Sequence, residues 1–218
     1  MSWMKIDQLI RSKRKTIALI VERDGRLVVR APLRIAEARI QAVVEQKAEW
    51  IRRKQAEARE APPVSPPRYV PGEEFPYLGR RYRLEIVDGA LQPLSLDGCF
   101  RLDRRALPRA ERIFQEWYRA RACEILTERV RVLAARHGLR PKQVRITSAR
   151  TRWGSCSAQG SLAFTWRLVM APPEAIDYVV IHELAHLRVR NHSKAFWAEV
   201  ERMMPEWREG KERLTRNT

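Results

Sequence analysis

The chain has 218 residues, of which 44% are hydrophobic and 32% charged, a composition typical of a globular protein that can bury a substantial core. No stretch approaches the roughly 18 apolar residues of a membrane span, and the apolar run Ile17–Val21 is too short for the core of a signal peptide. Length and hydropathy therefore argue against a membrane-spanning or secreted protein.

The net charge of +17 is unevenly distributed along the chain. Residues 1–60 carry 15 Lys/Arg against 8 Asp/Glu, and residues 101–153 carry 15 against 5, whereas residues 154–218 carry 9 against 8. Such a surplus favours contact with a polyanion, a nucleic acid or a nucleotide, through the two basic segments. Solubility alone explains the surplus equally well, because a charge count cannot identify a ligand.

The three cysteines, Cys99, Cys123 and Cys156, are far apart and form no C-x-x-C pair. Cysteines in this pattern are typical of a reducing compartment, where they act as small buried hydrophobic residues. We therefore expect a cytoplasmic protein.

The first third of the chain predicts a hairpin, a helix and a connector. Two runs rich in β-branched residues surround the turn pair Asp24-Gly25 within residues 16–31, which predicts a β-hairpin. Periodic apolar residues predict a helix over about 35–60. The five prolines of residues 61–72 exclude a helix there and indicate an extended connector.

The middle of the chain predicts short strands followed by one long helix. Residues 77–87 and 99–103 have strand-like composition and are separated by Asp-Gly turn pairs. A helix is then predicted from about Pro108 to His137, with Gly138 as its C-terminal cap. The apolar residues expected on its buried face are Ile113, Trp117, Ile125, Val132 and Leu133.

The last third predicts two strands and two helices. Residues 143–149 and 161–169 read as strands on either side of TRWGSCSAQG. A helix opens at residues 172–174 with proline and glutamate in its first turn, and Ser193 is a candidate cap for a further short helix. Beyond Pro205 the sequence is polar, which predicts a frayed end.

The segment HELAHLRVRNH, residues 182–192, holds three of the four histidines of the chain. His182 and His186 are four residues apart, so on a helix both rings can reach one metal ion. Glu183 is rotated by about 100° from His182 and can reach a water held on that ion. This is the H-E-x-x-H arrangement of two metal ligands beside a general base.

A catalytic zinc site usually has three protein ligands and a water, so a third ligand is required. His192 is the leading candidate, because RVRN is enough chain to end the helix and turn back towards the ion. A carboxylate of the next helix, Glu199 or Glu201, is the alternative third ligand. Cys156 could instead close the site as a fourth ligand, which would make the zinc structural.

The histidines therefore indicate one Zn²⁺ per chain in a hydrolytic site, although three histidines also accept manganese, nickel or iron. Zinc lowers the pKa of its bound water to about 7 and polarises a carbonyl or phosphoryl oxygen. Glu183 would accept the proton of that water and pass it to the leaving group. Residues 162–166 are either a sheet edge to which a peptide adds as a strand, or an inner strand with alternating core residues.

With these residues in place, the chain resembles the YgjP-like metal-dependent hydrolases, which are related to the SprT and Wss type of zinc metallopeptidases. The matching motifs are RWGSCS (152–157), VVIHELAHL (179–187) and NHSKAFW (191–197), and residues 11–32 and KAEWI (47–51) resemble the opening domain of the family. The combination of RWGSCS with HELAH-x5-H is much more specific than H-E-x-x-H alone.

The resemblance implies that His182, His186 and His192 bind zinc and that Glu183 is the catalytic residue. It also implies an α+β fold in which a small N-terminal hairpin, helix and β region precede a zincin-like C-terminal domain. In that domain we expect the active-site helix to lie against a small antiparallel sheet. The predicted domains are residues 1–103, including the connector 61–72, and residues 104–218.

The role of RWGSCS is open from the sequence. Trp153 could form a wall of the metal cleft, Gly154 could allow a close backbone approach, and Arg152 could contact a substrate oxygen. A tight turn with a buried tryptophan and Cys156 is an equally good interpretation.

Three functions fit these residues. The first is a zinc-dependent peptidase with a protein or peptide substrate. The second is a zinc-dependent nucleotide phosphoanhydride hydrolase. The sequence contains no Gly-rich phosphate cradle, which argues against this second function. The third is a nucleic-acid-associated binding protein with a structural metal site, supported by the basic segments.

Overall fold

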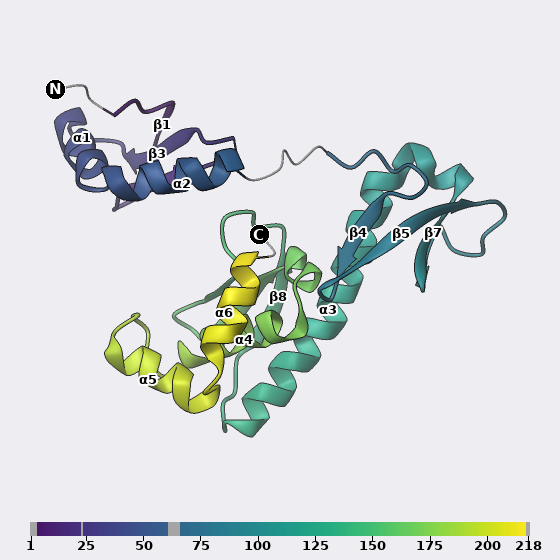
Figure 1. Cartoon of the computed structure of the whole chain (residues 1–218). Coiled ribbons are helices and arrows are strands. Elements are labelled where there is room, and N and C mark those ends of the chain that lie inside the picture. The colour runs from purple at the N-terminus through teal and green to yellow at the C-terminus, as the bar shows by residue number, and fades with distance from the viewer. Residues whose placement is uncertain (1–3, 23, 61–65, 217–218) are drawn as a thin grey trace. The chain divides into compact units, whose positions relative to one another are not determined.

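The computed structural model describes residues 4–22, 24–60 and 66–216 (Figure 1). Contacts divide the chain into an N-terminal unit, residues 1–66, and a C-terminal unit, residues 67–218. The fold is α+β, as predicted, with three small sheets and six α-helices over the described residues. No helix in those ranges is long and apolar enough to cross a membrane.

The N-terminal unit is a three-stranded sheet packed on two helices. The predicted hairpin is confirmed: β2 (Ala18–Val21) pairs antiparallel with β3 (Leu27–Pro32), and Gly25 in the turn has a φ of +82°. β1 (Gln8–Ser12), which the sequence did not indicate, pairs parallel with the other edge of β3.

The single helix predicted over residues 35–60 is two helices, α1 (Glu37–Gln46) and α2 (Ala48–Glu60). The break falls at Lys47, which has a φ of −107° and ψ of 11°. The sheet and both helices bury one small core of Leu27, Val29, Ala31, Ile40, Val44 and Ile51.

The C-terminal unit begins with a four-stranded sheet of order β4-β5-β7-β6. β4 (Glu74–Tyr77) and β5 (Arg80–Val87) form an antiparallel hairpin, so the strand predicted over residues 77–87 contains a turn at Leu78-Gly79. β7 (Cys99–Asp103) runs parallel to β5, and β6 (Leu94–Asp97) pairs antiparallel with β7.

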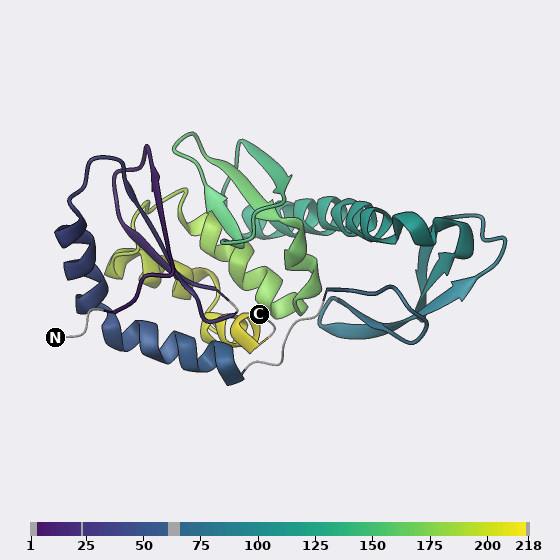
Figure 2. The same cartoon turned by 90° about the horizontal axis from the view of Figure 1, so that it is seen from above.

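The predicted long helix is α3 (Ala110–Arg136), which follows a 3₁₀ helix, η1 (Arg104–Arg109). Figures 1 and 2 show α3 running from the β4–β7 sheet at one end to the β8–β10 sheet at the other. Leu133 is buried as predicted, whereas Ile113, Trp117, Ile125 and Val132 are half-buried. The most buried face is centred on Phe114, Tyr118, Ala122, Leu126, Val130 and Leu133.

The second sheet of this unit has the order β8-β10-β9. β8 (Gln143–Thr147) runs parallel to β10 (Ser161–Thr165), and β9 (Gly154–Cys156) pairs antiparallel with the other side of β10. This sheet is therefore mixed and not purely antiparallel as predicted. The strand predicted to run to Val169 ends at Thr165, because η2 (Trp166–Met170) is a 3₁₀ helix that turns the chain towards α4.

Helix α4 (Pro173–Ala185) is almost entirely buried, which explains its near-continuous apolar sequence. Its N-terminus is pressed against the β4–β5 turn: a Cβ added to Gly79 would lie 2.7 Å from the Cβ of Pro172. Helix α5 (Lys194–Met203) follows, with the predicted Ser193 at its N-cap position but without a side-chain capping bond.

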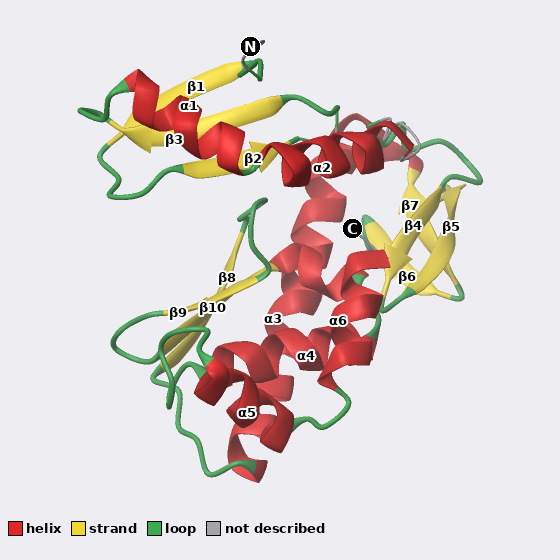
Figure 3. Ribbon diagram, turned by 60° about the vertical axis from the view of Figure 1, so that its left-hand side comes forward, coloured by secondary structure: helices red, strands yellow, loops and turns green. Residues whose placement is uncertain are grey.

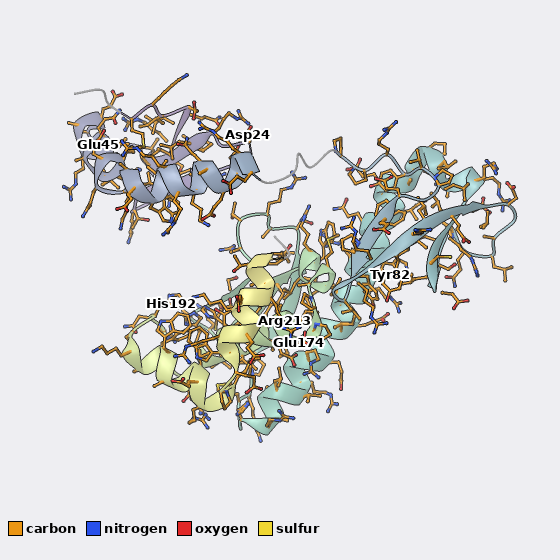
Figure 4. All side chains as sticks on the ribbon, in the orientation of Figure 1. Asp24, Glu45, Tyr82, Glu174, His192 and Arg213 are labelled. Atoms are coloured by element: carbon orange, nitrogen blue, oxygen red, sulfur yellow. The ribbon has the colours of Figure 1, made fainter. Side chains whose placement is uncertain are left out.

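The prediction that residues beyond Pro205 fray is wrong, because α6 (Trp207–Arg216) forms there and packs on α4. Trp207 and Leu214 are buried, and a Cβ added to Gly210 would lie 2.7 Å from the carbonyl oxygen of Glu174. Glu174 and Arg213 form an ion pair across the same contact, at 3.9 Å (Figure 4). The segment is polar on average, which is why the sequence analysis did not predict this amphipathic helix.

The boundary between the two units, at Pro66–Pro67, differs from the predicted domain boundary after residue 103. The physical reason is that the β4–β7 sheet has no core of its own. Phe75 and Phe100 from this sheet pack on Phe114 of α3, with ring centroids 4.3 and 5.1 Å away. Part of the predicted connector, residues 61–65, lies outside the described residues.

Candidate metal centre

The three predicted histidines converge at the C-terminal end of α4. His182 lies in α4, and His186 caps its C-terminus. His192 lies in the segment that leads to α5 (Figure 4). One ring nitrogen of each histidine lies within 4.8 Å of a ring nitrogen of each of the other two. The Nε2 atoms of His182 and His192 are 3.1 Å apart.

The chain reversal that returns His192 is built from the end of α4. The backbone N–H groups of Arg188 and Val189 both donate to the carbonyl oxygen of Ala185, which tightens the last turn. Nδ1 of His186 lies 3.1 Å from the carbonyl oxygen of Val189 and donates to it. A histidine whose Nδ1 carries the proton leaves its Nε2 lone pair free for a metal.

The surroundings of two of the rings, His182 and His186, favour the neutral form that binds metals. Burial lowers the pKa of His182 to about 4, and repulsion from the charged forms of His186 and His192 and from Lys211 adds to the effect. Burial also lowers the pKa of His186. Three imidazoles that converge on one place are a good donor set for zinc, so the residues present fit a divalent metal.

Phe196 of α5 is the common support of the three rings. It is fully buried, and its ring centroid is 4.5 Å from that of His186, 4.8 Å from His192 and 4.9 Å from His182. Phe196 falls in the short helix predicted after Ser193, but the sequence analysis assigned it no part in the site. Its position in NHSKAFW, four residues after His192, was the available signal.

The alternative ligands lie elsewhere. Both oxygens of Glu199 bind arginines: Oε1 accepts from Arg188 at 2.6 Å and Oε2 from Arg202 at 3.0 Å. Glu201 accepts from Arg208 at 2.8 Å. Cys156 is outside the histidine group found among the described residues, and its sulfur is 3.5 Å from the carbonyl oxygen of Ser157.

Glu183 lies one residue beyond His182 and is only 5% exposed. Its side chain lies against β9, since a Cβ added to Gly154 would be 2.6 Å from Oε1 of Glu183 and 2.7 Å from its Cγ. Burial raises the pKa of Glu183 to about 7, although the charge of Arg152 acts in the opposite direction. Gly154 thus allows a close approach, and the group that approaches is the glutamate side chain.

The rest of RWGSCS holds β9 in place. Trp153 is half-buried and packs against the core, and its carbonyl oxygen accepts from the N–H of Thr165. Cys156 is also half-buried, and its thiol pKa is raised by burial and by Glu183. Arg152 is exposed.

Of the two interpretations of residues 162–166, the inner strand is correct. β10 has β8 on one side and β9 on the other, so β9 forms the edge nearest α4 (Figure 3). Trp153 and Ser157 both bond back to β10. By alternation, the backbone N–H and C=O groups of Gly154 and Cys156 point away from β10 towards the open edge.

Helix α6 adds one aromatic side chain, Trp207, and one cation, Lys211, to the surroundings of the histidines. Trp207 stacks on Trp197 of α5 with centroids 4.7 Å apart, and on Tyr178 of α4 at 6.2 Å. The ammonium group of Lys211 lies 5.4 Å from the ring of Trp197 and 5.6 Å from that of Trp207. Trp207 and Lys211 lie in the segment that was expected to fray, so the sequence analysis missed both residues.

A helix that carries two histidines and a glutamate, with a third histidine returned by the following turn, is the arrangement of a metallopeptidase site. The comparison with protein families agrees. The chain belongs to the YgjP-like family: the family model described as "YgjP-like, metallopeptidase domain" matches residues 15–217.

Among solved structures, the chain is similar to that of the metallopeptidase zymogen abylysin of Pyrococcus abyssi. The two are 26% identical over 41% of this chain and 90% of that chain, with a TM-score of 0.38. No curated protein matches the chain.

Proposed function

We propose that this protein is a zinc-dependent peptidase in which His182, His186 and His192 hold one Zn²⁺ and Glu183 is the general base. The observation that supports it most is the convergence of three imidazoles directly beside a buried glutamate. Zinc bound there would supply Lewis-acid chemistry: it would polarise the substrate carbonyl and lower the pKa of the attacking water, which makes that water a better nucleophile. The family to which the chain belongs implies a protein substrate.

The role of Glu183 follows from its placement. Its carboxylate is held between α4 and Gly154, which fixes its position and shields it from bulk water. It would accept a proton from the attacking water while the water oxygen bonds to the carbonyl carbon. The same proton would then go to the amide nitrogen as the C–N bond breaks, giving a free carboxylate and a free amine.

The substrate would lie along the open edge of β9. The backbone groups of Gly154 and Cys156 that point away from β10 can pair with an extended peptide, which would then become the next strand. This placement brings a peptide carbonyl next to Glu183, because the glutamate side chain contacts Gly154.

Two substitutions test the assignment. His192→Ala should lower the zinc content from about one ion per chain to well below that value, whereas the matched His137→Ala variant should keep its zinc. Glu183→Gln should keep zinc and reduce proteolysis by about 10²–10⁴-fold, whereas Glu201→Gln, the same change at an arginine-paired glutamate of α5, should not.

Casein-like proteins and nucleoside triphosphates should be assayed side by side. Unchanged zinc in His192→Ala would remove that residue from the ligand set, and full activity of Glu183→Gln would exclude it as the base. Hydrolysis of nucleotides without cleavage of protein would overturn the peptidase assignment.

A further inference from the structure

Four arginines surround the turn between β8 and β9, residues 148–153. Arg119 comes from α3, Arg150 and Arg152 lie in the turn itself, and Arg167 comes from η2. We call these residues the arginine cluster. They are brought together from three parts of the sequence, which indicates a built feature and not a local run of basic residues.

The turn that carries the cluster is fixed by two threonines at the ends of neighbouring strands. The hydroxyl of Thr165 donates to the carbonyl oxygen of Ala149 at 2.7 Å, and the hydroxyl of Thr147 donates to that of Phe164 at 3.2 Å. Thr165 is only 2% exposed. The arginines are therefore presented by a firmly held turn.

Two of the guanidinium groups meet at one residue. Nη1 of Arg119 donates to the hydroxyl of Ser148 at 2.7 Å, and Nη1 of Arg167 lies 3.3 Å from the carbonyl oxygen of the same residue. Arg167 also lies over the ring of Trp166, 4.2 Å from its centroid, which holds the guanidinium in place.

The cluster is not neutralised. Over residues 4–22, 24–60 and 66–216, no carboxylate lies within ion-pair distance of any of its four arginines. The contrast within α3 is direct, because Arg112, Arg121, Arg129 and Arg131 all have carboxylate partners. Burial and the nearby charge of Arg150 lower the pKa of Arg167, as expected for a cation among cations without an anion.

The cluster is continuous with the edge at which the substrate is proposed to lie. Arg152 is two residues before Gly154, and a small cavity of about 60 Å³ joins them, lined by Arg152, Gly154 and Thr165 among others. A peptide paired with β9 that continues past Gly154 would advance by about 3.3 Å per residue. It would reach Arg152 and Arg150 two to four residues beyond the position opposite Gly154.

We infer that the arginine cluster is a specificity site for acidic side chains of the protein substrate, two to four residues from the one that pairs with Gly154. This inference rests on the proposed peptidase function. Guanidinium groups bind carboxylates through short charge-assisted hydrogen bonds, so glutamate and aspartate suit the cluster.

A nucleic acid fits the surroundings less well. Its backbone needs a basic track, since affinity grows with the number of neutralised phosphates. Residues 154–218, which form the metal centre and its neighbouring helices, carry 9 Lys/Arg against 8 Asp/Glu. The charges of this part of the chain nearly cancel, so it does not extend the arginine cluster into a strongly basic track.

The test uses labelled peptides that differ only in having glutamate or glutamine at the second to fourth positions on either side of the central bond. Binding is measured by fluorescence anisotropy with the zinc-loaded Glu183→Gln protein, which consumes no peptide, and cleavage with the unmodified protein. We expect tighter binding and lower KM for one glutamate peptide than for its glutamine counterpart, by up to about fivefold per arginine contact.

In the Glu183→Gln protein, an added Arg150→Gln substitution should remove most of the preference for the glutamate peptide. Arg150→Glu should reverse the preference towards a lysine peptide. Arg140→Gln, the same charge change at the opposite end of β8, should leave the preference intact. Circular dichroism checks that each variant is folded.

Equal binding of glutamate and glutamine peptides would overturn the inference, as would a preference that survives both Arg150 substitutions. So would tighter binding of a single-stranded oligonucleotide of matched charge through Arg150. If the charge preference is present and depends on Arg150 but no peptide is cleaved, the inference stands and the peptidase function fails. If cleavage occurs without any charge preference, the reverse holds.

Discussion

The two ends of α3 differ in what they bury. The distal end, formed by the β4–β7 sheet with residues 110–118 of α3, buries an aromatic cluster. Phe100 lies in its centre, with ring centroids 5.0 Å from Trp117, 5.1 Å from Phe114 and 6.1 Å from Phe75. The one hydroxyl deep in this cluster, that of Tyr118, donates to the carbonyl oxygen of Pro76 at 2.7 Å.

The site end, formed by the β8–β10 sheet with α4, α5 and α6, buries polar groups at a cost. Glu183 is nearly inaccessible, and Nδ1 of His182 and Nε1 of Trp207 are buried without a hydrogen-bond partner among the described residues. Buried polar atoms without partners cost free energy. The comparison indicates that the distal end supplies stability while the site end uses some of it for function.

Removing the central ring of the distal end should have the largest effect. Phe100→Ala should lower the free energy of unfolding by about 3–5 kcal/mol, because a fully buried ring leaves a cavity. Urea unfolding measures the loss, with Phe100→Leu as a milder control. Zinc content below the unfolding transition should stay unchanged, and its loss there would mean that the two ends are not separable.

A methyl group beside Glu183 should affect the site end almost alone. Gly154→Ala places a Cβ where the glutamate carboxylate now lies, so the carboxylate must move by about an ångström. Activity should fall by about 100-fold with normal zinc content, and Ser155→Ala is the neighbouring control. An active Gly154→Ala enzyme would contradict the assigned position of the base.

Removing the metal should destabilise the two ends unequally. Zinc at about 30 times its Kd stabilises the folded state by about 2 kcal/mol, and a chelator removes this contribution. Hydrogen exchange should then accelerate in α4 and in the segment that leads to α5, which carry the proposed ligands, before it changes in β5 and β7. Uniform acceleration would indicate a single cooperative unit without a distinct site end.

The smallest effect is expected at Glu199, whose pKa is lowered to about 2 by hydrogen bonds from Arg202 and Arg188. A lowered folded-state pKa stabilises the protein above the unfolded value, near 4.5, and this contribution is lost as pH falls from about 4.5 to 2. Glu199→Gln should therefore cost about 1 kcal/mol at pH 7 after allowance for solvent screening.

The difference between Glu199→Gln and the unmodified protein should shrink towards zero near pH 2, as followed by urea unfolding at several pH values. Arg188, one of the two partners, also donates to the carbonyl oxygen of His137 at the end of α3. A difference that is constant with pH would show that the carboxylate charge is not the cause.

Local patterns in the sequence predicted the grouping of the three histidines, the hairpin of β2 and β3, and the long helix, because their signals span neighbouring residues. The pairing of strands that are distant in the sequence could not be predicted from such local patterns. β9 has three residues and exists only because β10 pairs with it, and the parallel pairing of β8 with β10 joins segments 18 residues apart.

Helix α6 was missed for a different reason. Its signal, Trp207 and Leu214 seven residues apart, was present, but charged residues between them dominated the mean polarity. Phe196 was placed on a helix, yet its contact with three histidine rings depends on the tertiary fold. The sequence therefore located the three histidines and Glu183 better than it located the residues that hold them in place.

The contact between Gly79 and Pro172 determines how much of the chain a working fragment must contain. The start of α4 rests on a turn almost a hundred residues earlier in the sequence, and the contact leaves no room for a side chain at Gly79. A fragment cut at residue 104 would lose this support and expose Phe114. Residues 67–218 are therefore the shortest stretch that we would expect to fold with α4 correctly seated.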